Sequence, residues 1–166
     1  MRYHLAQVNI GRIRAPMQDP LMDGFRLALA RINALADASP GFVWRLQTEQ
    51  GNATSIHAFD DPLLLVNMSV WTTIEALHAY VYDSDHTPFV RARRQWFEPF
   101  EGPMLALWWV PEGHLPTVTE AKGRLELLAA RGPTPEAFTF RHTFPAPGGA
   151  PRPGPAVDAE FCRGPA

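Results

Sequence analysis

Cysteine is almost absent from this chain: among 166 residues there is a single one, Cys162, in a proline- and glycine-rich stretch. One thiol excludes an intrachain disulfide, a zinc site made of cysteines and a redox pair, and it suits a reducing compartment. The sequence also has no run of eighteen apolar residues and no apolar segment behind Met1. We therefore expect a cytoplasmic protein that neither spans nor binds a membrane.

Charge is scarce too and shows no excess of one sign. Lys122 is the only lysine, and 15 Lys and Arg residues stand against 17 Asp and Glu residues, for a net charge of -2. This balance lacks the positive field that binding to a phosphate backbone requires, so nucleic acid is not an expected partner. Glycine-rich phosphate loops, G-x-S-x-G elbows and cysteine nucleophiles are missing as well, which leaves nucleotide binding and covalent hydrolysis without support.

Apolar and aromatic residues, in contrast, are plentiful, at 46% and 11% of the chain. This composition is typical of a globular protein, and the length suits one domain with one core. Proline and glycine dominate the last part of the sequence, which contains too little apolar surface to offset its conformational entropy. The sequence thus predicts a domain over residues 1–142 and a disordered tail over residues 143–166.

Alternating apolar residues predict the strands of this domain. They cover residues 3–10, 42–47, 63–71 and 104–110. Residues 48–62 could form either an edge strand or an ordered loop. With a helix after the first strand and another after the third, the order predicts an α+β protein with a ferredoxin-like βαββαβ antiparallel sheet. Helices are expected on one face of this sheet.

Capping signals mark where the helices begin. Asp19 stands before a proline, and Thr72 is followed three residues later by a glutamate, as in a capping box. Thr87 and its following proline predict a further short helix. Thr117 begins the same capping pattern after the last strand, which predicts an extra C-terminal helix.

The first and third strands each have one apolar side and one mixed side. We expect the apolar sides to meet the helices, which leaves the mixed sides uncovered; these carry Gln7, Asn9, Asn67, Ser69 and Trp71. Burying a large aromatic side chain is worth roughly 1.5–3 kcal/mol, so such a face needs a cover. A second copy is the simplest cover and predicts a homodimer with a small-molecule pocket between two sheets. The alternative is an open face with scattered aromatic residues.

Four stretches of the sequence carry a likeness to known proteins. They are residues 33–46 (NALADASPGFVWRL), 66–71 (VNMSVW), 96–99 (WFEP) and 107–111 (LWWVP). These stretches resemble the bacterial domain-of-unknown-function family 3291, which has no established activity to transfer. The resemblance implies a dimeric α+β barrel, similar to the superfamily of antibiotic-biosynthesis monooxygenases, haem-degrading monooxygenases and small stress-response barrels. Because this fold supports many reactions, it implies no single function.

Haem-degrading members of that superfamily use an asparagine on strand one, a tryptophan at the end of strand three and a histidine on the next helix. By this resemblance Asn9, Trp71 and His78 are the expected catalytic residues. Asn9 would orient oxygen or substrate, Trp71 would shape the pocket, and His78 would act as a base or iron ligand. His86 could replace His78 as the iron ligand. A lone histidine on an apolar helix face can equally be a hydrogen-bonded core residue.

Other residues are expected to contact the substrate. They are Gln7, Asn67, Ser69, Trp44, His86 and Arg94. Arg94 and its neighbours Arg91 and Arg93 could hold an anionic substrate, since a guanidinium group suits a carboxylate, or could form a solvated helix face.

Together these patterns predict a dimeric barrel that binds a small molecule. We expect a monooxygenase-like oxidoreductase that acts on a planar organic substrate. Two alternatives stay open: a ligand-binding or stress-response barrel without catalysis, and a haem-binding protein. Haem and a cofactor-free site are both compatible with the sequence, and no metal site is expected apart from haem iron.

Overall fold

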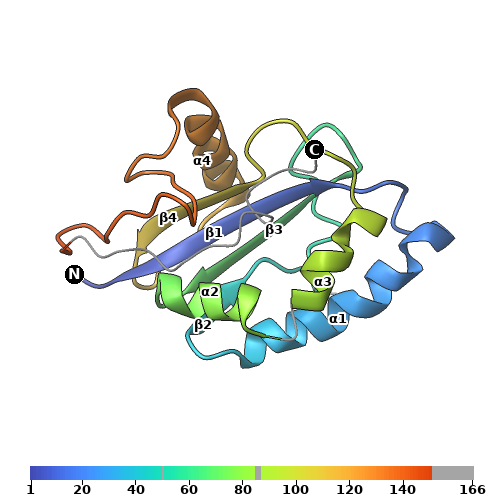
Figure 1. Ribbon diagram of the computed structural model, residues 1–166, viewed down its shortest axis with the longest axis horizontal. Helices are drawn as coiled ribbons and strands as arrows, with labels where there is room; N and C mark the ends of the chain where they lie inside the picture. Colours follow the sequence, from blue (N-terminus) through green and yellow to red (C-terminus); the bar gives the residue numbers. More distant parts are fainter. Residues whose placement is uncertain (50, 85–86, 151–166) are drawn as a thin grey trace.

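Four antiparallel strands form the sheet of this protein, and helices connect them in the expected order (Figure 1). The computed structural model describes residues 1–49, 51–84 and 87–150. The elements are β1 (Tyr3–Arg12), α1 (Asp23–Ala38), β2 (Phe42–Arg45), β3 (Leu64–Trp71), α2 (Ile74–Tyr82), α3 (Thr87–Ala92), β4 (Leu105–Pro111) and α4 (Val118–Arg131). The strand order β2-β3-β1-β4 is that of a ferredoxin-like fold, so the predicted α+β class is confirmed.

Side chains cap the 3₁₀ turn before α1, the start of α2 and the start of α4, with one difference from the prediction. Asp19 caps a short 3₁₀ turn that leads into α1, and Thr117 caps α4. At α2 the cap is Thr73, whose side chain accepts a backbone hydrogen bond, and not Thr72. The backbone N–H of Thr72 donates to the carbonyl oxygen of Gly41 at 2.8 Å. Thr72 is thereby held beside the end of the sheet, and the helix starts one residue later.

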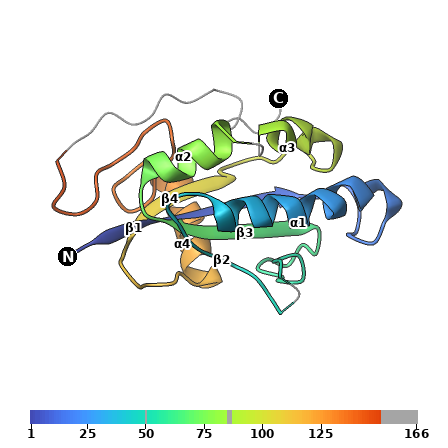
Figure 2. The same ribbon diagram turned by 90° about the horizontal axis from the view of Figure 1, so that it is seen from below.

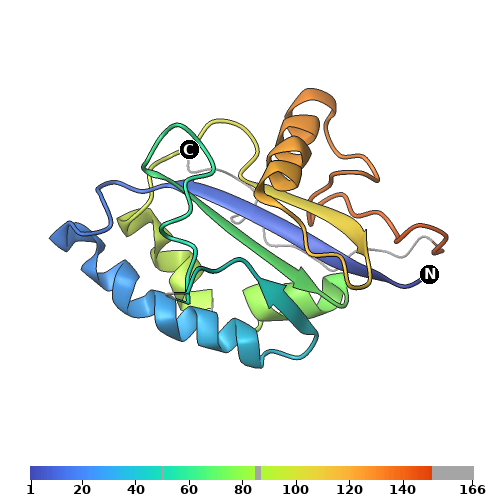
Figure 3. The same ribbon diagram turned by 180° about the vertical axis from the view of Figure 1, so that it is seen from behind.

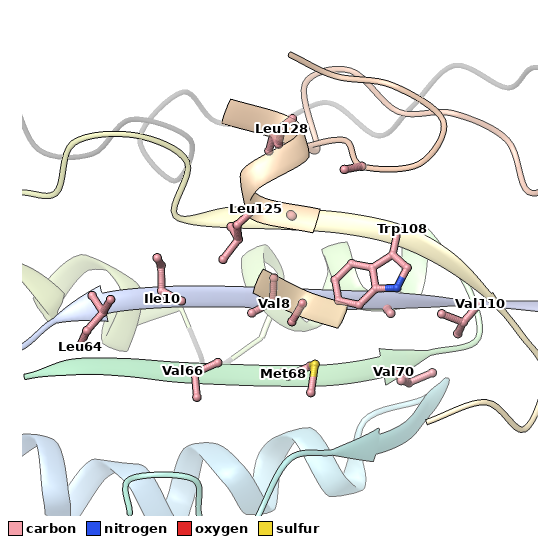
Figure 4. Packing of buried hydrophobic residues seen from close by; sticks show 14 residues of the cluster. Val8, Ile10, Leu64, Val66, Met68, Val70, Trp108, Val110, Leu125 and Leu128 are labelled. Carbon is pink, nitrogen blue, oxygen red and sulfur yellow. The ribbon is translucent and has the colours of Figure 1, made fainter. Parts of the chain in front are cut away.

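The apolar side of the sheet packs against α4 (Figure 4). Val8, Met68 and Trp108 on this side are at most 1% exposed, and Leu125 and Leu128 of α4 complete the cluster. The connection between β2 and β3 is a long loop, which Figure 3 shows from behind. It adds further apolar side chains to the cluster, namely Leu46, Ile56, Ala58 and Phe59. This side is therefore covered within one chain.

The mixed side of the sheet lies under α1, α2 and α3 of the same chain. The expectation that this side is uncovered is therefore wrong. Leu5 and Trp71 of the sheet pack with Leu77 of α2, while Leu65 packs with Phe25 of α1. Figure 2 shows α2 and α3 on one side of the sheet and α4 on the other. Both sides carry enough aliphatic residues to bind helices, so a second copy is not needed to cover either one.

An irregularity in β2 separates two of its aromatic residues. Phe42 is paired with Trp71 and Trp44 with Val70, so two steps along β2 correspond to one step along β3. Such a β-bulge reverses the alternation of side chains. Phe42 consequently packs on the mixed side, Trp44 on the apolar side, and Arg45 again faces the mixed side.

The segment after α4 returns to the sheet. Phe138 and Leu107 of β4 exchange two backbone hydrogen bonds of 2.8 and 2.9 Å. The indole N–H of Trp109 donates to the carbonyl oxygen of Phe144 at 2.8 Å, so the beginning of the expected tail packs on the domain. The rest of that tail, residues 151–166 with Cys162, lies outside the described residues. None of the described helices is long and apolar enough to span a membrane.

Candidate functional site

A cavity lies between the mixed side of the sheet and α1, α2 and α3. The space open to the centres of water molecules in this cavity is about 130 Å³. An engineered apolar cavity of about 150 Å³ holds benzene, so there is room for one aromatic ring with small substituents. The polar and charged side chains of its lining are Gln7, Asn9, Asn33, Arg45, Thr54, Asn67, Ser69, Tyr80 and Arg93.

Strand register brings four of these polar side chains together. Gln7 of β1 stands opposite Ser69 of β3, and Asn9 stands opposite Asn67. The side-chain amide nitrogen of Gln7 donates to Ser69 Oγ at 2.9 Å and to Asn67 Oδ1 at 3.1 Å. The indole N–H of Trp71 also donates to Ser69 Oγ, at 2.8 Å. Ser69 thus accepts two hydrogen bonds, which leaves its own O–H as a donor without a partner among the described residues.

Asn9 has a different role from its neighbours in this row. Its side-chain amide lines the cavity and makes no hydrogen bond to any described residue. An amide carries two N–H donors and one acceptor oxygen, so Asn9 offers both kinds of group to a ligand. Asn67 beside it is exposed to solvent, which means that the cavity reaches the surface at this point.

Aromatic rings form part of the cavity wall, at Trp71 and Tyr80. The rings of Trp71 and Tyr80 stack with centroids 5.0 Å apart, and Phe42 meets the Trp71 ring edge-on at 5.4 Å. Burial raises the pKa of the Tyr80 phenol, so this group stays protonated. Its O–H donates to the carbonyl oxygen of Ile32 at 3.3 Å. The wall therefore presents flat, neutral surface of the kind on which a planar ring packs.

Two arginines line the cavity, and they differ in their partners. Arg45 donates to both carboxylate oxygens of Asp37, at 2.8 and 3.2 Å, and to the carbonyl oxygen of Gly51 at 2.8 Å. Arg93 makes no ion pair and no side-chain hydrogen bond with any described residue. Its guanidinium carbon lies 5.0 Å from the centroid of the Phe97 ring. Burial lowers the pKa of Arg93, although an arginine in a protein keeps its charge.

Gly11 makes room for this arginine. A methyl group on Gly11 would lie 2.5 Å from Phe97 Cδ1 and 3.2 Å from Arg93 Nη2. Gly11 follows Asn9 by two residues on β1, so both positions face the same side and lie roughly 7 Å apart. The guanidinium group of Arg93 is thereby placed over the sheet beside Gly11, in the cavity that Asn9 also lines.

The residues predicted on the first and third strands meet in this cavity as a group. Gln7, Asn9, Asn67, Ser69 and Trp71 all line it. The surroundings differ from the prediction, because helices of the same chain face these side chains where a second sheet was expected. The cavity is therefore formed within one chain.

The other predicted site residues lie elsewhere. His78 follows the cavity-lining Leu77 on α2 and packs against the ring of Tyr82 at 4.5 Å, outside the lining. Trp44 is on the opposite side of the sheet because of the bulge in β2. Arg94 is exposed, since Arg93 and Arg94 lie in a 3₁₀ helix, where each residue is rotated by about 120° from its predecessor. His86 lies outside the described residues.

Haem does not fit the described residues of this cavity. Among them no histidine lines the cavity, and the available space suits a single ring and not a tetrapyrrole. Across residues 1–49, 51–84 and 87–150, no group of three or more His, Cys, Asp or Glu side chains is placed to hold a metal ion. We therefore derive no step through haem.

Sequence reasoning named Arg93 only as one of three neighbouring arginines, because the pattern does not tell which of them turns inward. It missed other residues of the cavity, among them Gly11 and Tyr80. Gly11 had a usable signal, because a glycine within a strand often marks the close approach of another group. Tyr80 follows Leu77 by three residues, the spacing of one helix face, and this could have placed it beside the buried stripe.

Comparison with known protein families shows to which family this chain belongs. Residues 4–153 match the family described as Domain of unknown function (DUF3291). The chain belongs to this family. The match confirms the resemblance carried by the four sequence stretches. It includes all the residues that line the cavity.

Solved structures of similar proteins share part of this fold. SnoaB, a cofactor-independent oxygenase from Streptomyces nogalater, is 21% identical with a TM-score of 0.43, over 69% of this chain and 98% of that one. The NE2512 protein of unknown function from Nitrosomonas europaea is 13% identical with a TM-score of 0.47, over 69% of this chain and 96% of that one. Likenesses at these TM-scores carry no argument about function. A comparison with curated proteins finds no match.

Proposed function

We propose that this protein binds a small planar organic molecule in the cavity between the sheet and α1–α3 and oxidises it in the manner of a monooxygenase. The observation that supports binding is the make-up of the cavity. It is the size of a ring, with an aromatic wall at Trp71 and Tyr80 and a floor of amide and hydroxyl groups. Apolar walls with a few oriented polar groups are typical of small-molecule sites.

Asn9 and Trp71 are the residues to which we assign roles in the reaction. The free amide of Asn9 would donate to an oxygen of the ligand and hold the ring in one orientation. Trp71, fixed by its hydrogen bond to Ser69, would shape the cavity. Oxidation is supported by the elements on which these two residues lie, β1 and the end of β3, where haem-degrading members of the implied superfamily carry an asparagine and a tryptophan.

The lining also restricts the substrate. Among the described residues that line the cavity there is no carboxylate and no imidazole, so no ordinary general base is at hand. A suitable substrate is therefore acidic by itself. Without a cofactor, all electrons come from the substrate: an activated CH₂ group becomes a carbonyl group. One oxygen atom of O₂ enters the product, and the other leaves as water with the two hydrogens.

Oxygen uptake with 1,3-cyclohexanedione tests this reaction. The compound is a single ring, forms a planar enolate without a strong base and has an activated CH₂ group. We expect consumption that depends on the protein and falls about tenfold or more in Asn9→Ala, because a hydrogen bond to a charged oxygen is lost. The control is Gln47→Ala, which removes an exposed amide outside the cavity.

If the protein consumes no oxygen, the proposed oxidation is wrong. The alternative named from the sequence, a ligand-binding barrel without catalysis, would then remain. The homodimer and the cytoplasmic location also stay predictions. With both sides of the sheet covered in one chain, the dimer is supported only by the resemblance to dimeric barrels.

A further inference from the structure

We infer that the ligand of this cavity is a planar organic acid, bound as its anion by the guanidinium group of Arg93. The inference rests on the proposed binding function and adds the chemical class of the ligand. It depends on the surroundings of Arg93, on the orientation of its N–H groups and on the absence of a base in the described lining.

The surroundings of Arg93 leave its charge uncompensated. Phe25, Phe89, Phe97 and Leu65 line the same part of the cavity and pack in one apolar cluster. A charge among such residues loses hydration and is unfavourable unless an opposite charge approaches. No described acidic side chain approaches it. An anion that enters the cavity would supply this missing partner.

The guanidinium group is also oriented for such a partner. Its central carbon lies over the ring of Phe97, and the open backbone of Gly11 admits its Nη2 atom to the sheet. Its N–H groups remain free, and their fork matches the two oxygens of a carboxylate. Arg45 could not take this role, since Asp37 and the Gly51 carbonyl already occupy its donors.

The position of Arg93 sets where the rest of the ligand lies. From Gly11, the next residue on the same side of β1 is Asn9, roughly 7 Å along the strand. A ring attached to a carboxylate at Arg93 would reach this distance and lie against the Asn9 amide. Phenylalanine and leucine side chains of the apolar cluster would flank it.

An ionised acid suits this cavity better than a phenol does. A carboxylic acid has a pKa of about 4 and is an anion at neutral pH without help. A phenol, with a pKa of about 10, would need a base to become one, and the described lining contains no carboxylate or imidazole for this purpose.

Calorimetric titration with benzoate and benzamide separates charge from shape. The two compounds have the same size and ring, and only benzoate is an anion. We expect benzoate to bind the wild-type chain about tenfold or more tightly than benzamide, as a charged hydrogen-bonded pair allows. Arg93→Gln should weaken benzoate binding about tenfold or more relative to benzamide binding, and so remove this preference. Arg131→Gln, an exposed arginine on α4, is the matched control and should retain the preference.

The outcomes separate the inference from the function on which it rests. Equal affinities for the two compounds in the wild type would overturn the inference, and so would an unchanged preference for benzoate in Arg93→Gln. In both cases, binding of benzamide would still support the cavity as a ligand site. No binding of either compound would overturn both. If Arg93→Gln fails to fold, Arg93→Lys keeps the charge without the fork. It should then weaken benzoate binding more than benzamide binding, and equal weakening would count against the inference.

Discussion

At the scale of single residues, Ser69 holds the polar part of the cavity together. Its Oγ accepts hydrogen bonds from Gln7 and from the indole of Trp71. In Ser69→Ala the buried indole N–H loses its acceptor, and a buried donor without a partner costs about 1–3 kcal/mol. We expect the free energy of unfolding in urea to fall by that amount. Ser55→Ala, at an exposed loop position, should change it by less than about 0.5 kcal/mol. Equal effects of the two substitutions would contradict this role of Ser69.

Gly11 gives a second prediction at this scale. A methyl group there would overlap the ring of Phe97 and press on Arg93. Gly11→Ala should therefore destabilise the protein by about 1–3 kcal/mol, the usual cost of overpacking. Gly123→Ala is the matched control, because Gly123 lies in α4 with no atom within 4 Å of the added methyl group. It should stabilise the protein by roughly 0.5–1 kcal/mol, since alanine favours a helix over glycine. Opposite signs in urea denaturation are thus expected, and equal signs would contradict the close packing at Gly11.

At the scale of elements, Glu120 joins α4 to β4. One of its carboxylate oxygens accepts from the indole of Trp108 at 2.9 Å, and the other lies 2.9 Å from His114 Nε2. Burial raises the pKa of Glu120, but the hydrogen bonds from His114 and Trp108 outweigh it, and the pKa lies below its ordinary value of 4.5. The carboxylate therefore stabilises the fold above that pH, and this contribution is lost as the pH falls through the lowered pKa.

Glu120→Gln tests this link. At pH 7 we expect a loss of about 0.5–1 kcal/mol in the free energy of unfolding, less than for a fully buried charged hydrogen bond because solvent screens this partly exposed group. The difference from wild type should shrink as the pH falls below 4.5. Glu126→Gln, at an exposed position of the same helix, should show little change. A difference that stays constant with pH would mean that charge has no part in the link.

The elements also show how far the sequence alone could lead. Alternation in β1 and β3 was enough to group Gln7, Asn9, Asn67, Ser69 and Trp71, because side chains of a strand alternate strictly. It could not tell which side the helices cover, since both sides contain leucines or valines that pack equally well. The bulge in β2 was also hidden, because one extra residue leaves no mark in a strand of four residues and yet moves Trp44 across the sheet.

At the scale of the whole molecule, the residues that line the cavity all come from one chain, and this holds for a monomer and for a dimer alike. Light scattering with size exclusion measures the assembly itself, and the predicted homodimer has twice the chain mass of 18.5 kDa. In either state, calorimetry with benzoate should give one ligand per chain. One ligand per two chains would instead indicate a pocket shared between subunits, and the cavity under α1–α3 would not be the site.

Nuclear magnetic resonance during a benzoate titration tests the central claim most directly, because it shows on which side of the sheet the ligand binds. Asn9 lines the cavity on the mixed side, whereas Trp108 is buried against α4 on the other. We predict that the side-chain amide signals of Asn9, assigned with Asn9→Ala, shift in a saturable way while the indole N–H signal of Trp108 stays in place. A shift at Trp108 with no change at Asn9 would contradict the account.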